Sequence, residues 1–429
     1  MPSQTYHSLT ISSKTVALIL AGGRGSRLYE LTDRRSKPAV HFGGNYRLID
    51  FALSNCVNSG IRRIAVATQY KSHSLLRHLQ RGWGFLQSRM NEFVDMLPAQ
   101  QRIDETSWYR GTADAVYQNI DIIKSYRPKA EYILILAGDH IYKMNYAVMI
   151  DEHIKSGAEC TVACIEVPRE KAKGFGVMDV SESGRIVNFV EKPADPPSMP
   201  GNPDMSLCSM GIYVFNADYL YNALDADVLD PQSVHDFGKN IIPKAVEAGV
   251  AMSHRFSHSC VHDPDETEGK EDYWRDVGTL DAFWEANIDL TNTDPTLSLY
   301  DLHWPIMTAM AQLPPAKFVH NEERRRGFAV QSLVADGCIV SGEVTRSVVG
   351  VGCRIHGGAK VEYSCLAPDV TIGYGARVSH CIIDTEVVIP DHMVIGEDKD
   401  MDAKYFRRTA SGITLVTKEM IASLNAKRL

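Results

Sequence analysis

A glycine turn that carries basic side chains follows the first apolar segment of the chain. Residues 18–28 read Leu-Ile-Leu-Ala-Gly-Gly-Arg-Gly-Ser-Arg-Leu, and Lys37-Pro38 follows downstream. Because glycine lacks a Cβ, such a turn can bring backbone N–H groups against phosphate oxygens. Arginine and lysine add the positive charge. The pattern predicts a seat for a nucleoside triphosphate, made by Gly22, Gly23, Arg24, Gly25, Arg27 and Lys37.

Two other glycine loops fit this turn poorly. A P-loop ends in Gly-Lys-Ser or Gly-Lys-Thr, whereas Gly25 is followed by Ser26-Arg27. A dinucleotide-binding turn needs a third small residue where this chain has Leu28, and no acidic residue stands in register at the end of a second strand. On the residues alone, a plain strand-to-helix turn with solvated arginines stays open as an alternative.

Aspartates in two distant segments are candidate metal ligands. Asp139 follows an apolar segment through Gly138, and Asp276 lies in Trp274-Arg-Asp-Val-Gly278. Transfer of a nucleotidyl group needs two anions held in line and a divalent metal on the attacked phosphate. Mg²⁺ prefers one or two carboxylates together with substrate oxygens and water. Taken singly, Asp139 is equally explained as a helix cap and Asp276 as a loop residue.

Alternating strands and helices must position these residues. Four short apolar segments read as strands, at residues 16–21, 63–68, 132–137 and 160–167. Apolar residues at helical spacing indicate helices between them, at 49–57 and 113–124. The alternation is typical of an α/β fold with a mostly parallel sheet covered on both faces, which binds ligands at the carboxyl ends of its strands. The glycine turn, Gln69 and Asp139 should therefore share one edge.

A six-residue period replaces this pattern beyond Leu313-Pro-Pro315. The apolar positions are Val349, Ile355, Val361, Ile372, Val378, Ile383, Ile389 and Ile395. In a hexapeptide repeat each short strand forms one side of a triangular coil, with the apolar residue inside. The period predicts a parallel β-helix over about 337–397, followed by a closing helix at 418–425.

Composition limits the classes of partner. At 429 residues the chain is long enough for two domains, and its net charge of −8 argues against broad nucleic-acid binding. Its apolar runs fall far short of the ~20 residues of a membrane helix, and residues 1–15 lack the apolar segment of a signal peptide. Nine cysteines without a Cys-x-x-Cys pair fit reduced thiols. We therefore expect a cytoplasmic protein that binds small molecules and neither membranes nor nucleic acid.

Four side chains with the chemistry of zinc ligands stand at even-numbered positions, so on one strand they would point to the same face: His254, His258, Cys260 and His262. Apolar side chains also stand at even-numbered positions in this segment, namely Val250, Met252 and Phe256. The simpler prediction is therefore the half-buried face of one strand, not a metal site.

Longer segments resemble one family. The pattern Leu-Ala-Gly-Gly-x-Gly-Ser-Arg-Leu…Lys-Pro is similar to the signature of sugar-phosphate nucleotidylyltransferases. Further segments in family order resemble bacterial glucose-1-phosphate adenylyltransferases (ADP-glucose pyrophosphorylases): residues 37–44, 50–55, 108–115, 138–142, 189–193, 209–215 and 273–279. The resemblance implies a Rossmann-like nucleotidyltransferase sheet over 1–295, a linker over 296–336 and a left-handed parallel β-helix domain over 337–429. It also implies transfer of adenylyl from ATP to α-D-glucose 1-phosphate for glycogen synthesis.

The resemblance also implies roles for individual residues. Arg24 and Lys37 would stabilise the leaving pyrophosphate, and Asp139 and Asp276 would bind Mg²⁺. Gly22, Gly23, Gln69 and Gly111 would bind ATP. The residues implied for glucose 1-phosphate are Tyr109, Gly176, Glu191, Lys192 and Ser209. Since Glu191 and Lys192 are adjacent, we expect them to point to opposite faces of an extended segment. Without the resemblance, the simpler interpretation of this pair is a solvated ion pair.

The family is typically regulated by small anions and forms homotetramers. Four residues match the basic cluster that it uses for effectors: Arg34, Arg35, His41 and Arg47. Arg34 stands where the enteric pattern has lysine, which suggests fructose 6-phosphate and pyruvate as activators, with AMP, ADP or phosphate as inhibitors. The basic run Arg324–Arg326 is interpreted as a solvated linker, with the same anion site as the alternative.

Three rival functions differ in substrate or in the domain that acts. The first is the same reaction with UTP, dTTP or GTP. The second is a catalytically silent regulatory or binding subunit, which the retention of both aspartates, Lys37 and Lys192 argues against. The third is an acyltransferase that works from the β-helix, where His356 and His380 lie on coils that look short for binding acyl-CoA.

Overall fold

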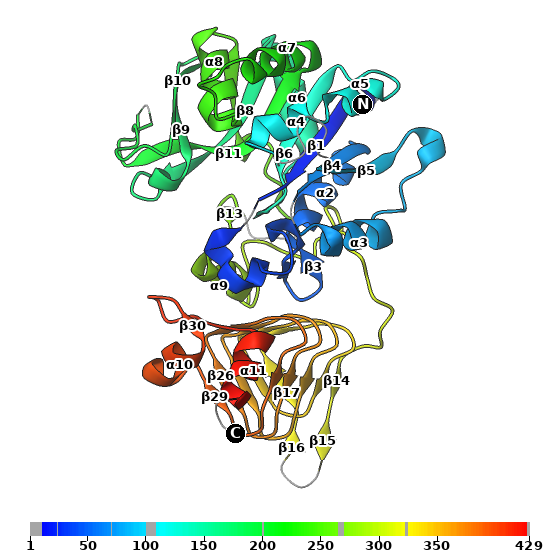
Figure 1. Ribbon diagram of the computed structural model, residues 1–429, viewed down its shortest axis with the longest axis vertical. Helices are drawn as coiled ribbons and strands as arrows, with labels where there is room; N and C mark the ends of the chain where they lie inside the picture. The colour runs from blue at the N-terminus through cyan, green and yellow to red at the C-terminus, as the bar shows by residue number, and fades with distance from the viewer. Residues whose placement is uncertain are drawn as a thin grey trace.

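The computed structural model describes residues 11–23, 25–69, 71–99, 109–199, 201–264, 270–321 and 325–426. A sheet domain flanked by helices lies above a coiled stack of short strands, and the chain passes between them along one side (Figure 1). Within the described residues, no helix combines the length and the apolar character needed to cross a bilayer.

The centre of the first domain is a nine-stranded sheet. Its parallel part has the order β6 (Tyr132–Ala137), β1 (Thr15–Ala21), β4 (Arg63–Thr68) and β5 (Phe93–Pro98). The predicted mostly parallel sheet is therefore confirmed at its centre. An antiparallel extension continues beyond β6 through β11 (Met205–Asn216), β9 (Gly176–Val180) and β10 (Ile186–Glu191), with β8 (Cys160–Pro168) and β12 (Ala251–Arg255) branching from β11.

Helices cover both faces of the sheet, because its strands are apolar on both sides. Two buried clusters result, one built on Ile19 and Leu136 and the other on Leu18 and Ile135. The helices are α2 (Leu48–Asn58), α3 (His73–Gly82), α4 (Thr112–Tyr117), α5 (Ile120–Ser125), α6 (Tyr146–Ser156), α7 (Ala217–Val228), α8 (Ile242–Glu247) and α9 (Leu280–Asp289).

The helix predicted at 113–124 is in fact two helices, α4 and α5. Asn119 lies at the break with φ of −108° and ψ of 6°. Its side-chain amide donates to Ala115 O and to the hydroxyl of Tyr109. Asparagine competes in this way with the helical hydrogen bonds of the main chain, which explains the break.

The second domain is the predicted parallel β-helix. Its three faces are β14-β19-β22-β25-β28, β17-β20-β23-β26-β29 and β18-β21-β24-β27-β31. Every apolar residue named from the six-residue period is at most 1% exposed. The strands are β14 (Lys317–Phe318), β17 (Phe328–Val330), β18 (Leu333–Val334), β19 (Ile339–Val340), β20 (Glu343–Thr345), β21 (Val348–Val349), β22 (Arg354–Ile355), β23 (Lys360–Glu362), β24 (Cys365–Leu366), β25 (Thr371–Ile372), β26 (Arg377–Ser379), β27 (Cys381–Ile383), β28 (Val388–Ile389), β29 (Val394–Ile395) and β31 (Thr414–Val416).

The β-helix begins earlier than the sequence predicts. Its first coil contains β14, β17 and β18, which pair with the next coil although they lie in the predicted linker. The apolar residues Phe328 and Val330 are exposed, so apolar residues in this coil do not mark its inward-facing positions in the sequence. The coils end in α10 (Lys399–Tyr405), β30 (Arg407–Arg408) and β31, and α11 (Lys418–Ala426) is the predicted closing helix.

Candidate active site

The glycine turn lies directly beyond the carboxyl end of β1. Gly25 has φ of 57°, and a Cβ there would lie 2.9 Å from the Thr32 side chain and 3.2 Å from the Lys37 Cβ, so glycine is required. A 3-10 helix, η1 (Ser26–Thr32), follows, and Lys37 begins a second one, η2 (Lys37–Ala39), with Pro38 in its first turn. Arg24, predicted to act on pyrophosphate, lies outside the described residues.

Lys37 joins the two predicted metal-binding aspartates. Its Nζ lies 2.8 Å from Asp139 Oδ2 and 3.0 Å from Asp276 Oδ1. Asp139 is in the turn between β6 and β7 (His140–Tyr142), and Asp276 ends β13 (Trp274–Asp276), which pairs antiparallel with β7. The pairing of β13 with β7 therefore brings together residues that are far apart in the sequence.

The charges in this group stabilise one another. Burial alone would lower the pKa of Lys37, but the nearby carboxylates of Asp139 and Asp276 raise it above its usual value. Burial likewise opposes ionisation of Asp139, yet His140 and Lys37 hold the pKa of this carboxyl below its usual value. Asp139 is therefore ionised and Lys37 is charged near pH 7.

The arrangement of oxygens fits a divalent cation. Side-chain ligand atoms of Asp139, His140 and Asp276 lie within 4.8 Å of one another. Two carboxylates that leave room for substrate oxygens and water are the donor set that Mg²⁺ prefers. Arg27 approaches from the turn, with Nη2 3.9 Å from Asp276 Oδ2. The group thus combines anionic ligands with cations that can face phosphates.

Sequence reasoning did not single out His140 as a member of this group. Its Nε2 lies 3.5 Å from Asp139 Oδ1 and 4.0 Å from Asp276 Oδ1, and its ring packs edge-on against Trp274. The signal was present in the segment Gly138-Asp-His-Ile-Tyr142.

Gly22, Gln69 and Tyr109 form a second part of the site. A Cβ on Gly22 would lie 3.2 Å from the Gln69 Cβ, so the amide side chain packs over the turn. Gln69 Nε2 also lies 3.4 Å from Tyr109 O. The structure therefore brings Tyr109, which the resemblance assigned to the sugar, into contact with Gln69, which it assigned to the base.

Glu191 is the centre of a third group. Its carboxylate lies between two glycines, because a Cβ on either Gly176 or Gly238 would lie 2.8 Å from Glu191 Oε2. The expectation that Glu191 and Lys192 point to opposite faces is wrong. Lys192 has φ of 51°, which ends the extended segment, and its Nζ pairs with Glu191 Oε1 at 3.0 Å.

Asp236 connects this third group to α4 and was not identified from the sequence. Thr112 Oγ1 donates to Asp236 Oδ2 at 3.0 Å, and Asp236 Oδ1 accepts from the backbone of Lys239. The segment Asp236-Phe-Gly238 is the sequence feature that could have identified it. Ser209, also predicted for the sugar, accepts a hydrogen bond from the backbone of Gly211 at the irregularity in β11.

Known proteins match both domains. A nucleotidyl transferase family matches residues 16–293, and a GlmU-like, C-terminal hexapeptide family matches residues 314–416. The glucose-1-phosphate adenylyltransferase of Granulibacter bethesdensis is 58% identical over 416 residues, covering 97% of this chain and 99% of that protein. That of Rhizobium meliloti is 58% identical over 96% of this chain and 98% of its own length. A Francisella tularensis enzyme of the same name is 56% identical over 96% and 97%.

The chain belongs to the glucose-1-phosphate adenylyltransferase family.

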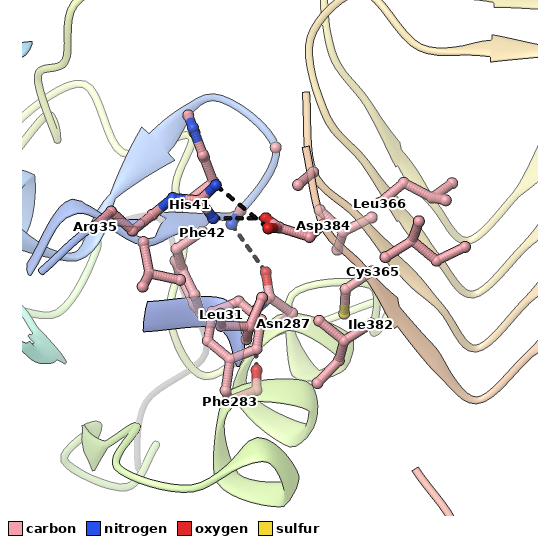
Figure 2. Close-up of a pocket in the computed structure, with 16 residues that line it drawn as sticks. Leu31, Arg35, His41, Phe42, Phe283, Asn287, Cys365, Leu366, Ile382 and Asp384 are labelled. Carbon is pink, nitrogen blue, oxygen red and sulfur yellow. Dashed lines mark hydrogen bonds and ion pairs between the residues drawn. The ribbon is translucent and has the colours of Figure 1, made fainter. Parts of the chain in front are cut away.

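The four residues predicted for effectors lie at or near the domain junction. Arg35 pairs with Asp384 of the β-helix, with Nη1 2.5 Å from Oδ1, and donates to Thr385. Figure 2 shows Arg35, His41 and Asp384 around a crevice between η1, α9 and the β-helix. Arg34 forms an ion pair with Glu419 of α11. Arg47 instead donates within the sheet domain, to Ala39 O and Ser74 Oγ.

A second contact joins the β-helix to η1, the helix that follows the glycine turn. Arg407 on β30 pairs with Glu30, with Nε 2.6 Å from Oε2 and Nη2 2.5 Å from Oε1, and its guanidinium lies 4.2 Å from the centre of the Tyr29 ring. Tyr29 has φ of 49°, a conformation that costs energy for a residue other than glycine. Thr409 also donates to Asp281, five residues beyond Asp276. Movement of the β30–β31 hairpin would therefore reach both sides of the active site.

Two other predictions are corrected here. The strand that carries His254 ends at Arg255, and the chain turns into η6 (Phe256–His258), so the four candidate zinc ligands do not share one strand face. Of the basic run 324–326, the described Arg325 and Arg326 form β16, which pairs with β15 (His320–Asn321) at the end of the β-helix remote from the sheet domain (Figure 1). The described part of this run does not join the effector residues.

Gly111 is predicted to be required for the fold of the site. An added Cβ would lie 2.2 Å from His235 O and 2.6 Å from Val234 O, where the backbone of Ala113 already donates to His235 O. We expect Gly111→Ala to lower the free energy of unfolding by about 1–3 kcal/mol, the usual range for overpacking, and to lower turnover. Thermal denaturation measures the first effect. Gly174→Ala is the matched control, because its Cβ would meet nothing within 4 Å, and an equal loss in both variants would contradict the prediction.

Proposed function

We propose that this chain transfers the adenylyl group of ATP to α-D-glucose 1-phosphate, releasing pyrophosphate and forming ADP-glucose for glycogen synthesis. Membership of the glucose-1-phosphate adenylyltransferase family supports this reaction. The observation that carries the proposal is the convergence of Lys37, Asp139 and Asp276 beside the glycine turn.

The chemistry requires little covalent work from the protein. A phosphate oxygen of glucose 1-phosphate attacks the α-phosphorus of ATP, and the bond from that phosphorus to the bridging oxygen breaks as pyrophosphate leaves. No general base is needed, because the attacking phosphate is already an anion near pH 7. The protein must hold two anions in line and neutralise their charge.

The side chains divide this work. Lys37, with Arg27 and Arg24 of the turn, would neutralise the charge that develops on pyrophosphate. Gln69 would pair with adenine through its amide, with Gly22, Gly23 and Gly111 allowing close approach of the nucleotide. Lys192 would face the sugar phosphate and Glu191 the sugar hydroxyls. The other members of the sugar site would be Tyr109, Gly176 and Ser209.

Asp139 and Asp276 would hold Mg²⁺. Bound there, the ion would supply charge neutralisation at the attacked phosphate. Their carboxylate oxygens are near enough for one dication, and the Asp139 carboxyl is charged at neutral pH.

The substrate assignment is tested by release of pyrophosphate. Protein, Mg²⁺ and glucose 1-phosphate are mixed with ATP, UTP, dTTP or GTP in separate reactions. We expect turnover with ATP to exceed that with every other triphosphate. Preference for another triphosphate would identify a different nucleotide-sugar pyrophosphorylase, and absence of turnover with all four would favour a catalytically silent subunit.

We propose that small anions regulate the enzyme at the crevice beside Arg35, with fructose 6-phosphate and pyruvate as activators and AMP, ADP or phosphate as inhibitors. The guanidinium of Arg35 is a fork that suits phosphate and carboxylate. Burial and the positive charges of Arg47 and Arg35 hold the pKa of His41 well below its usual range. His41 is thus neutral at pH 7, and the cationic members of the four residues predicted for effectors are Arg34, Arg35 and Arg47.

Asp384 should compete with such an anion for Arg35. We expect Asp384→Asn to lower the concentration of fructose 6-phosphate or pyruvate that gives half-maximal activation by about 3–10-fold, because the Arg35 guanidinium loses its carboxylate partner. Activation curves for each effector, measured separately, check this. Glu397→Gln, which removes the partner of Arg377 elsewhere on the β-helix, is the control. A raised or unchanged half-maximal concentration in Asp384→Asn would contradict the proposed position of the site.

We also propose a division of labour between the domains, with catalysis in residues 1–295, a linker from residue 296 up to β14, and regulation and assembly in the β-helix domain that begins with β14. A homotetramer is the proposed assembly, supported by exposed apolar side chains on the β-helix domain such as Val388, Val394 and Met401. Native mass spectrometry measures the number of chains directly. A cytoplasmic location is proposed because all nine cysteines are free thiols, as expected in a reducing compartment.

A further inference from the structure

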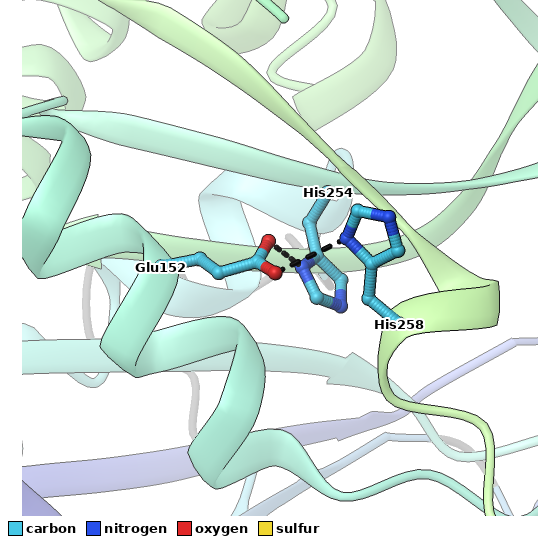
Figure 3. Close-up of side chains that lie close together, drawn as sticks. All are labelled: Glu152, His254 and His258. Atoms are coloured by element: carbon cyan, nitrogen blue, oxygen red, sulfur yellow. Dashed lines mark hydrogen bonds and ion pairs between the residues drawn. The ribbon is translucent and has the colours of Figure 1, made fainter.

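Two histidines and a glutamate converge at the end of β12, outside the active site. Glu152 projects from α6 toward His254, the fourth residue of β12, and toward His258, the last residue of η6 (Figure 3). Nδ1 of His254 lies 2.6 Å from Glu152 Oε2, and Nδ1 of His258 lies 3.1 Å from Glu152 Oε1. The ligand atoms of the three side chains all lie within 4.8 Å of one another.

A hydrogen-bond chain fixes the ring of His254. The Ser259 hydroxyl lies 2.7 Å from His254 Nε2 and 3.4 Å from Phe256 O, so it holds the ring nitrogen that is distant from Glu152. Nδ1 of the same ring faces the Glu152 carboxylate, in the place where a bound metal ion would replace the shared proton. Metal-binding histidines are oriented in the same way, with the distant ring nitrogen held by a second group.

Burial and charge make this group suitable for a metal ion. The side chain of His254 is fully buried, whereas His258 and Glu152 are 52% and 40% exposed, so the group is rigid on one side and open on the other. A hydrogen bond from His254 lowers the pKa of Glu152, which keeps its carboxylate anionic. Two imidazoles and a carboxylate are a donor set that zinc uses where it keeps a position for water.

We propose that Glu152, His254 and His258 bind a divalent transition-metal ion of the zinc class. Ligands about 2.0 Å from a tetrahedral centre are roughly 3.3 Å apart, so the observed 2.6 and 3.1 Å separations need only small outward movements. A remaining position faces a hollow lined by Ser183, Gly184, Ser253 and Arg255 among others, where water can complete the coordination.

The ion would tie η6 to α6. η6 also packs against the segment that carries Asp139, because the rings of Phe256 and Tyr142 meet edge-on with centres 6.4 Å apart and Met144 bridges to Cys260. The site shares no residue with Asp139 and Asp276. It is therefore a structural site, which stabilises the η6 segment that packs against β7, and it supplies no group to the reaction.

The test uses Co²⁺ and Zn²⁺ with the full-length protein and no nucleotide. Co²⁺ in a low-symmetry site with nitrogen ligands gives visible absorption much stronger than Co²⁺ bound by oxygens alone. We expect one such equivalent, displaced by Zn²⁺, in the unmodified chain. His258→Ala and Glu152→Gln should each weaken Zn²⁺ binding, measured against a chelating dye, by at least about 10-fold, and Ser259→Ala by about 10-fold through the orientation of His254.

His262→Ala is the matched control, because Cys260, His262 and Asp272 form a separate group of ligand atoms within 4.8 Å. It should leave the binding unchanged, and the Co²⁺ spectrum should lack the thiolate-to-metal band that Cys260 would produce. Loss of binding in His262→Ala with retention in His258→Ala would overturn the proposal. So would the absence of a bound equivalent in the unmodified chain. Because His258 is largely exposed, His258→Ala should keep its melting temperature without metal, which shows that it folds.

Discussion

Replacement of Asp139 by Asn should lower turnover by at least about 10²–10³-fold while the protein stays folded. Asn keeps the shape of the side chain and an oxygen for Lys37, but it removes one of the two charges proposed to hold Mg²⁺. The measurements are the rate of pyrophosphate release at saturating substrates and Mg²⁺, and a thermal denaturation curve for the same sample.

Asp225→Asn on α7 is the control for Asp139→Asn, because this exposed aspartate lies outside the three groups of site residues. The turnover of the double variant Asp139→Asn/Asp276→Asn should be only slightly below that of the less active single variant. Both carboxylates would bind one ion, so the two losses are not additive. Near-normal turnover of Asp139→Asn would remove the basis for the proposed metal site.

Replacement of Lys37 by Met should lower turnover by about 10²-fold or more and should make the stability of the protein depend on Mg²⁺. Met fills the space of the lysine stem but removes the ammonium group that lies between the Asp139 and Asp276 carboxylates. Without Mg²⁺ we expect the free energy of unfolding to fall by about 1–3 kcal/mol. Added Mg²⁺ should restore more stability to this variant than to the unmodified protein, because a dication can replace the lost ammonium.

The difference in stability between Lys37→Met and the unmodified protein should depend on pH in a defined way. The pKa of Asp139 is lowered in the folded state, so its contribution is present above the ordinary value of 3.8 and is lost as the pH falls through the folded value. The pKa of Lys37 is raised, so its contribution is full below the ordinary value of 10.5 and is lost as the pH rises through the folded value. The difference should therefore be a plateau between these limits and shrink at both ends.

Chemical denaturation at several pH values, with and without Mg²⁺, measures this plateau. Lys360→Met is the control, since Lys360 pairs with Glu343 on the exposed face of the β-helix and should contribute little. If Lys37→Met were as stable as the unmodified protein at pH 7 without Mg²⁺, the carboxylates would not be in the charged, closely paired state described here.

The sequence by itself determined the features that depend on local chemistry. The strands at 16–21, 63–68 and 132–137 follow from short apolar runs, and the β-helix follows from a six-residue period whose apolar members all lie inside. The glycine turn likewise depends on residues that are adjacent in the chain. These features can be recognised in the sequence because one segment contains the whole pattern.

Only the tertiary structure decided which distant side chains meet. Asp276 reaches Lys37 because β13 pairs with β7, and no local period records that pairing. The orientation of Lys192 depends on one left-handed residue. Three further contacts belong to the same class, namely Glu191 with Gly238, Arg407 with Glu30, and Glu152 with His254. Each depends on packing between segments separated by long stretches of chain, so the energy that fixes it is absent from either segment alone.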